Sequence, residues 1–235
     1  MAKRKARGIT KTNTTYKCSR CHDNEFILQT DSEGREVAIE CSCRARRALE
    51  RALNYGNISE SFRKRTFKSF KEVTEDLSEV KKECVDFVRK KEYQKKSIAL
   101  TGQVGSGKTH LAIAIANELL DASIRVYFVD YRQLVTELKQ SLIDRDRYSE
   151  IMRKCREADI LFIDDLFKGK MTETDVNIVY EIVNYRYLNK KQMIITSEKS
   201  IYEMLEFDEG VASRIYEMAG KKTIKMPSHN HRLIK

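Results

Sequence analysis

Residues 97–120 read SIALTGQVGSGKTHLAIAIANELL, and they carry the strongest structural signal in the chain. The apolar start of this stretch, SIAL at 97–100, is typical of a buried strand, and HLAIAIANELL at 110–120 is typical of a helix. Between them lies a loop with three glycines that ends in Lys-Thr. Such a loop points its backbone N–H groups at a bound phosphate, and the helix N-terminus attracts anions. The stretch therefore predicts a phosphate-binding loop, or P-loop, at residues 102–109.

The loop matches the pattern G-x-x-x-x-G-K-T without a mismatch. We expect Lys108 to reach the β- and γ-phosphates of ATP or ADP, and the Thr109 hydroxyl to ligate Mg²⁺. The residues expected to contact the nucleotide are Gly102, Gln103, Val104, Gly105, Ser106, Gly107, Lys108, Thr109 and His110. The alternative is a glycine-rich turn followed by Lys-Thr by chance, which the flanking strand and helix disfavour.

A second motif, ILFIDD at 160–165, is an apolar strand that ends in two carboxylates. A buried parallel strand ends at the ligand crevice, so these carboxylates are expected beside the nucleotide. Asp164 is predicted to hold Mg²⁺, directly or through water, and Asp165 to orient and polarise the attacking water. A solvated Asp-Asp turn is the alternative, which the P-loop makes less favourable.

Apolar runs alternate with amphipathic segments along most of the chain. Strands are expected at 97–100, 125–130, 159–164, 192–197 and 222–226, and helices at 75–94, 110–120, 133–142, 174–188 and 211–219. Short apolar strands that alternate with helices indicate a parallel sheet covered on both faces. The expected fold class is α/β, with a five-stranded parallel sheet.

Four of the six cysteines cluster near the N-terminus. They are Cys18, Cys21, Cys41 and Cys43. The segment between them alternates in polarity around a turn at 31–34, which predicts a small hairpin. Four thiolates suit tetrahedral Zn²⁺, and so small a segment has little core without a metal. Four unligated thiols and an iron–sulfur cluster remain as alternatives.

The chain has 235 residues and a formal net charge of +10, most of which lies in the first third. Residues 1–70 hold sixteen Lys and Arg against eight Asp and Glu, which leaves only +2 for the rest. This excess fits a nucleic acid or an acidic protein partner. The first 17 residues hold six Lys and Arg and no acid, as in a solubilising tail or a nucleic-acid-binding arm. No apolar run approaches the roughly 20 residues of a membrane span.

These motifs together resemble the DnaC/DnaI-type AAA+ helicase loaders and the related IstB transposition ATPases. The resemblance is carried by the P-loop, the Ile-Asp-Asp motif, a polar strand end at Thr196-Ser197-Glu198 and the late Ser-Arg-Ile at 213–215. The N-terminal four-cysteine unit is similar to that of DnaI-like and phage-encoded loaders. The resemblance implies an AAA+ ATPase that self-associates when it binds ATP.

The resemblance also implies roles for residues outside the P-loop. Arg214 falls on the arginine-finger position, which acts on ATP held by a neighbouring subunit. Arg232 falls where loaders carry another phosphate-sensing arginine. Glu198 stands where the sensor strand of the family usually has Asn, so either Ser197 senses the phosphate or sensing is altered.

We expect residues 1–55 to form a basic tail and a zinc-binding helicase-interaction domain, and residues 56–235 to form the ATPase domain. The expected function is to load a DnaB-type hexameric replicative helicase onto single-stranded DNA, in the cytoplasm of a bacterial or phage-infected cell. One alternative is an IstB-like ATPase that regulates a transposase, and another is a zinc-containing adaptor that binds ATP as a structural switch. Lys139, Arg145 and Arg147 follow the second strand, where relatives contact DNA, although a solvated charged loop is the simpler interpretation.

Overall fold

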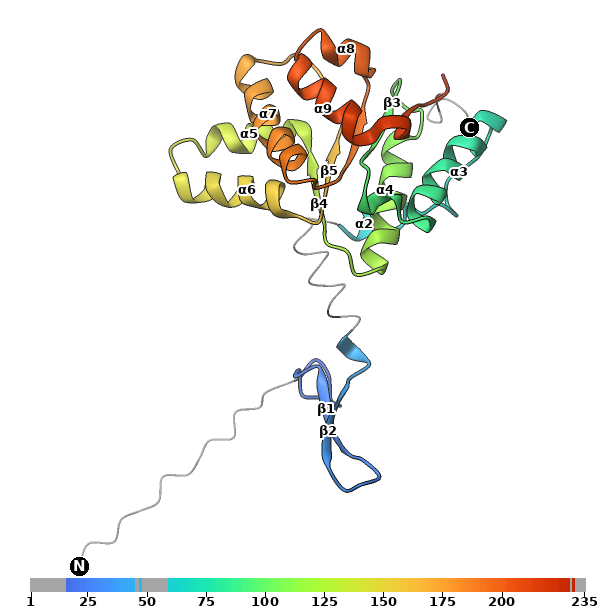
Figure 1. Cartoon of the computed structure of the whole chain (residues 1–235), viewed down its shortest axis with the longest axis vertical. Coiled ribbons are helices and arrows are strands. Elements are labelled where there is room, and N and C mark those ends of the chain that lie inside the picture. Colours follow the sequence, from blue (N-terminus) through green and yellow to red (C-terminus); the bar gives the residue numbers. More distant parts are fainter. Residues whose placement is uncertain (1–15, 45–46, 48–58, 229, 231–235) are drawn as a thin grey trace, which may run out of the picture. The chain divides into compact units, whose positions relative to one another are not determined.

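The structure is a computed structural model that describes residues 16–44, 47, 59–228 and 230. The chain divides into two compact units, Met1–Ala48 and Leu49–Lys235. Figure 1 shows the elements of each unit. The domain boundary expected after residue 55 falls outside the described residues.

The first unit is built on a two-stranded antiparallel hairpin of β1 (Phe26–Thr30) and β2 (Glu36–Glu40). Its turn is closed by Asp31, whose Oδ1 accepts the backbone N–H groups of residues 33 and 35, each at 2.9 Å. Gly34 supplies the left-handed position of this turn, with φ +81°. The sequence correctly predicts this hairpin.

The second unit contains a sheet of five parallel strands in the order β4-β5-β6-β3-β7. The strands are β3 (Ile98–Thr101), β4 (Val126–Asp130), β5 (Ile160–Asp164), β6 (Met193–Ser197) and β7 (Thr223–Lys225). The expected α/β class with a five-stranded parallel sheet is confirmed. Because β6 lies between β3 and β5, the P-loop and the Asp-Asp motif approach the same edge of the sheet from either side of β6.

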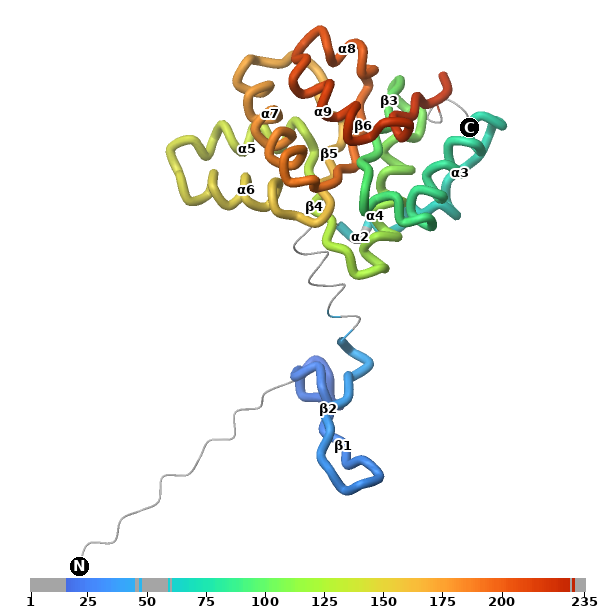
Figure 2. Tube along the Cα trace, in the orientation of Figure 1, coloured from blue at the N-terminus to red at the C-terminus, as the bar shows by residue number. Residues whose placement is uncertain are grey.

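Helices cover both faces of this sheet, as Figures 1 and 2 show. Successive side chains of β5 alternate between two cores, with Leu161 and Ile163 in one and Ile160 and Phe162 in the other. The first core is completed by α5 (Tyr131–Gln140), α6 (Arg145–Glu157), α7 (Glu173–Leu188), α8 (Ile201–Leu205) and α9 (Glu209–Ala219). The second is completed by α2 (Glu60–Arg63), α3 (Glu75–Arg89) and α4 (Lys108–Asp121). Among the described residues, no helix combines the length and the apolar character needed to cross a bilayer.

The structure differs from the expected elements at several places. The helix expected at 75–94 ends at Arg89, because Lys91 turns the chain with φ +53° and a 3₁₀ turn follows at Glu92–Gln94. Helices α6 and α8 were not expected. In α6 the apolar stripe consists of few residues among many charges, yet it places Ile151 and Cys155 in the core.

Candidate nucleotide site and cysteine cluster

The P-loop joins β3 to α4 through three glycines in left-handed backbone conformations. Gly102, Gly105 and Gly107 have φ values of +142°, +78° and +96°, which residues other than glycine rarely adopt. A Cβ added at Gly105 would also collide with the side chain of Asn230. The Ser106 hydroxyl is buried and has no hydrogen-bond partner among the described residues. A loop with this backbone and an unpaired buried hydroxyl fits a phosphate ligand.

Lys108 begins α4 and folds its side chain back across the loop. Its Nζ donates to the carbonyl oxygens of Gly102 at 2.7 Å and Gln103 at 2.8 Å. The residue is only 5% exposed. Burial lowers the pKa of the amine, and the nearby carboxylate of Asp165 opposes this effect. The ammonium is thus held at the loop, where phosphate oxygens would replace the two carbonyls as its partners.

Asp164 ends β5 next to the first turn of α4. Its Oδ1 accepts hydrogen bonds from Thr109 Oγ1 at 2.9 Å and from Thr196 Oγ1 at 2.5 Å. Burial raises the pKa of this carboxyl, whereas the Thr196 hydroxyl lowers it. The oxygens of Thr109 and Asp164 lie together beside the P-loop, and such oxygens are the ligands that Mg²⁺ prefers. The residues present therefore fit a magnesium–nucleotide complex.

Asp165 lies at a sharp turn after β5, with φ +54°. Its backbone N–H donates to Thr196 Oγ1 at 2.8 Å, so one hydroxyl contacts both aspartates of the motif. Its carboxylate pairs with Lys168 Nζ at 2.6 Å, and the same ammonium lies 3.2 Å from Glu198 Oε1. A left-handed residue other than glycine stores strain, and such strain is commonly retained at functional sites. The lysine bridge joins acidic groups that follow two adjacent strands.

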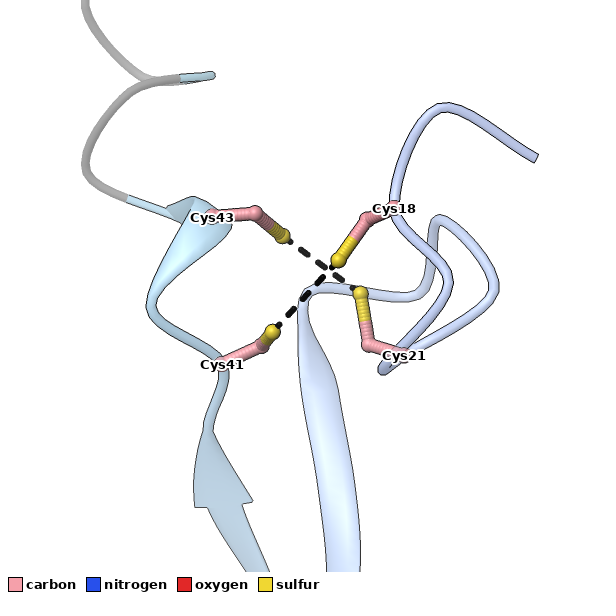
Figure 3. Close-up of side chains that lie close together, drawn as sticks. All are labelled: Cys18, Cys21, Cys41 and Cys43. Atoms are coloured by element: carbon pink, nitrogen blue, oxygen red, sulfur yellow. Dashed lines mark hydrogen bonds between the residues drawn. The ribbon is translucent and has the colours of Figure 1, made fainter.

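The four clustered cysteines converge at the base of the hairpin (Figure 3). Their sulfur atoms all lie within 4.8 Å of one another, with Cys18 Sγ 3.8 Å from Cys41 Sγ and Cys21 Sγ 3.4 Å from Cys43 Sγ. Four sulfurs at about 2.3 Å from one Zn²⁺ would be about 3.8 Å apart. The donor set therefore fits a structural zinc ion. His22 lies outside this set, and its ring stands 4.7 Å from that of Tyr16.

Comparison with known proteins places the chain in a family. Residues 17–215 match the family model described as IstB-like ATP binding protein. The chain belongs to this family. The phage-like element PBSX protein XkdC of Bacillus subtilis (strain 168) is 38% identical to this chain over 234 residues, which cover 93% of the chain and 86% of the relative.

Two solved structures share the fold of this IstB-like chain. The DnaC helicase loader superposes with a TM-score of 0.62 and 22% identity, over 72% of this chain and 99% of the loader. DnaI superposes with the same TM-score and identity, over 74% of this chain and 94% of DnaI. The fold is thus that of AAA+ loaders, and nucleotide binding follows from the family.

Two of the residues that the sequence placed near the nucleotide have other partners in the IstB-like chain. Ser197 Oγ is buried and donates to the carbonyl oxygen of Leu166 at 2.7 Å, whereas the preceding Thr196 contacts the aspartates. His110 Nε2 lies 3.0 Å from the carbonyl oxygen of Thr66, in the segment before α3. The sequence identifies Thr196 only as part of a polar strand end, although a hydroxyl residue directly after the apolar run MII indicates a polar contact at the end of this strand.

Arg214 lies on the surface formed by α7 and α9 of the IstB-like chain. Its Nε donates to Asn184 Oδ1 at 3.0 Å and its Nη1 to the carbonyl oxygen of Gly210 at 2.8 Å. Its guanidinium also lies 5.2 Å from the ring of Tyr180 and 5.5 Å from that of Tyr187. These partners all come from α7 and α9, so the structure does not bring Arg214 to the P-loop of its own chain.

The C-terminal segment approaches the P-loop. Met226 N donates to the carbonyl oxygen of Thr101 at 2.7 Å, and Asn230 lies against Gly105. Arg232 lies outside the described residues, so its expected role stays a prediction. Asn230 is a contact to the P-loop that the sequence did not predict.

Proposed function

We propose that this chain is an ATP-dependent loader that delivers a DnaB-type hexameric replicative helicase onto single-stranded DNA. The observation that carries the ATPase part is that Thr109 of the P-loop contacts Asp164. The Thr196 hydroxyl in turn contacts both Asp164 and Asp165. The family and the shared fold with the DnaC helicase loader support the loading part.

Each residue of the site has a separate role in the hydrolysis of ATP. The P-loop amides and Lys108 bind the phosphates, and Thr109 and Asp164 hold Mg²⁺, which neutralises charge on the phosphate oxygens. Asp165 orients and polarises the attacking water. Its ion pair with Lys168 uses one carboxylate oxygen, Oδ2.

Arg214 completes the site of a neighbouring copy of the chain in this proposal. A guanidinium is planar and permanently charged, so it can stabilise negative charge on a transferring phosphoryl group. The two tyrosine rings hold it at the surface of α7 and α9, where a second copy can reach it. Assembly and ATP turnover are therefore coupled.

The first unit is proposed to dock the helicase, with zinc held by the four cysteines. Its hairpin exposes apolar side chains on both faces: Phe26 and Leu28 are 44% and 68% exposed on one face, and Val37 and Ile39 are 37% and 40% exposed on the other. Exposed apolar groups on so small a unit are typical of a protein-interaction site. A zinc ion would hold the two strands together while these groups face a partner.

Co-purification from an extract of the encoding bacterium, with ATP present, tests the loading role. The tagged full-length chain should retain a DnaB-type helicase, identified by mass spectrometry. Leu28→Glu should lose it, because a charge enters the apolar face, and Ser32→Glu, in the exposed turn outside both strands, should retain it. If the wild-type chain retains no helicase under these conditions, the loading role is wrong.

The second candidate function is that of an IstB-like ATPase that regulates a transposase. The family match favours it, because the matched model is that of IstB-like proteins. The same co-purification separates the two functions, since a transposase would be retained in place of the helicase.

A further inference from the structure

A hollow of about 700 Å³ lies at the edge of the sheet opposite to the P-loop. It is bounded by residues 94–96 before β3, by residues 187–192 between α7 and β6, and by residues 217–220 at the end of α9. In a parallel sheet, the connections that enter the strands share one edge and the ligand site lies at the other. The hollow is therefore separate from the nucleotide site.

The charge of the hollow is strongly positive. Lys95, Lys96 and Lys190 line it and are exposed. Within the described ranges, none of these three lysines forms an ion pair. Glu217 is the one acidic residue in the lining, and its carboxylate accepts a hydrogen bond from the Tyr187 hydroxyl at 2.9 Å. Three cations thus face solvent with little neutralisation.

Two basic residues of the second unit that the sequence suggested as DNA contacts are neutralised by carboxylates. Lys139 and Arg147, which follow the second strand of the sheet, pair with Asp175 and Glu137 respectively. An external anion would have to compete with these carboxylates. Compared with Lys139 and Arg147, the three lysines of the hollow can bind an anion without first breaking an ion pair.

Helix dipoles explain only part of this arrangement. Lys190 follows the C-terminus of α7, where a cation is favoured by the helix dipole. Lys95 and Lys96 instead lie well beyond the end of α3 at Arg89, in the connection that enters β3. Their clustering with Lys190 has no such structural cause.

We infer that this hollow binds the phosphate backbone of a DNA strand, without regard to base sequence. Lysine ammonium groups act as point charges that contact phosphates of any sequence. Protein partners are usually held by arginine or aromatic anchors. The lining contains no arginine, and its one aromatic ring, that of Tyr187, already lies against Arg214. A polyanion is thus a better match than an acidic protein.

The site can be located by acetylating the lysines of the nucleotide-free full-length protein and analysing it by mass spectrometry. An oligodeoxythymidylate should protect Lys95, Lys96 and Lys190. Three other exposed lysines should stay reactive, and these are Lys64, Lys82 and Lys225. Equal modification with and without the oligonucleotide would overturn the proposal. Protection by poly-L-glutamate alone would overturn it as well, in favour of an acidic protein partner.

Neutralising the hollow gives a second test with a different readout. In the variant Lys95→Gln/Lys96→Gln/Lys190→Gln, the slope of log affinity for the oligonucleotide against log salt should fall by roughly 2, because about 0.7 is lost per single-strand phosphate contact. The matched variant Lys64→Gln/Lys82→Gln/Lys225→Gln should keep the wild-type slope. An unchanged slope in the hollow variant would contradict the proposal. No helicase, transposase or ATP is present, so this result is independent of the proposed function.

Discussion

At the scale of single residues, the Thr196 hydroxyl organises the site more than any residue picked out by motif. It donates to the Asp164 carboxylate and accepts the backbone N–H of Asp165, and the residue is fully buried. It therefore fixes the carboxylate proposed to hold Mg²⁺ and the strained turn that aims Asp165. A hydroxyl with two such partners is difficult to replace, because each would be left unsatisfied in a buried position.

Replacing Thr196 with valine should lower kcat for ATP hydrolysis by at least about tenfold, with a smaller effect on KM, because misplacement of catalytic groups costs rate while the P-loop stays intact. Thr196→Ser keeps the hydroxyl and should retain most of the activity. Steady-state phosphate release measures both. Equal kcat values for the two variants would show that the hydroxyl does not position the aspartates.

Asp164 is predicted to reduce the stability of the nucleotide-free protein. Burial raises the pKa of its carboxyl, so at neutral pH the charged form is less favourable in the folded protein than in the unfolded chain. Asp164→Asn should therefore raise the thermal unfolding midpoint at about pH 7. The gain should shrink as the pH falls through the raised pKa toward the unfolded value of about 3.9, because the folded carboxyl then takes up its proton.

Differential scanning fluorimetry across this pH range tests the Asp164 prediction. Asp165→Asn is the matched control, since it removes an ion pair with Lys168 and should give no such gain. A midpoint for Asp164→Asn that stays at or below the wild-type value near neutral pH would disprove the prediction.

At the scale of elements, a buried arginine joins α7 to α6 and to the starts of two strands. Arg186 has no exposed surface, and its guanidinium donates to five backbone carbonyl oxygens. These belong to Cys155, Arg156, Ala158, Asp159 and Gln192. It donates to carbonyl oxygens at the C-terminus of α6, which have no partner within the helix. It also donates to carbonyl oxygens just before β5 and β6.

Arg186→Met should lower the free energy of unfolding by about 3 kcal/mol or more, because several buried carbonyls lose their donor at once. Urea unfolding measures the change. Arg153→Met on the exposed face of α6 removes one surface ion pair and should change stability by less than about 0.5 kcal/mol. Similar values for the two variants would rule out this role for Arg186.

The elements that the sequence predicted are those marked by a local pattern of apolar residues and glycines. The strand, loop and helix around the P-loop follow from an apolar run, three glycines and a second apolar run. Helix α6 lacked such a signal, because its apolar residues are separated by charges. Thr196 meets the aspartates, and Glu198 meets Lys168, only because β6 pairs with β5, and a single sequence does not reveal that pairing.

At the scale of the whole molecule, the chain combines two units with different sources of stability. The second has two large apolar cores. The first has a two-stranded hairpin and a small cluster formed mainly by its cysteines. An isolated hairpin is marginally stable in water, so the first unit should depend on a metal ion.

Protein purified without chelators should contain about one Zn²⁺ per chain, measured by plasma mass spectrometry. Cys41→Ser/Cys43→Ser should release the metal, and the first unit should lose its structure while the second still binds nucleotide. Cys84→Ala, a buried cysteine outside the cluster, should keep the metal. A wild-type protein without metal, or full zinc in the double variant, would contradict the assignment.

We propose that the P-loop site hydrolyses ATP and that Asp165 activates the attacking water. Phosphate release and ATP binding, measured on the same samples of wild type and Asp165→Asn, test this claim most directly. Asp165→Asn should bind ATP about as well as wild type and hydrolyse it at least about a hundredfold more slowly, since general-base catalysis contributes roughly 10²–10⁴-fold. Hydrolysis by Asp165→Asn at the wild-type rate, with ATP bound at the P-loop, would contradict this claim.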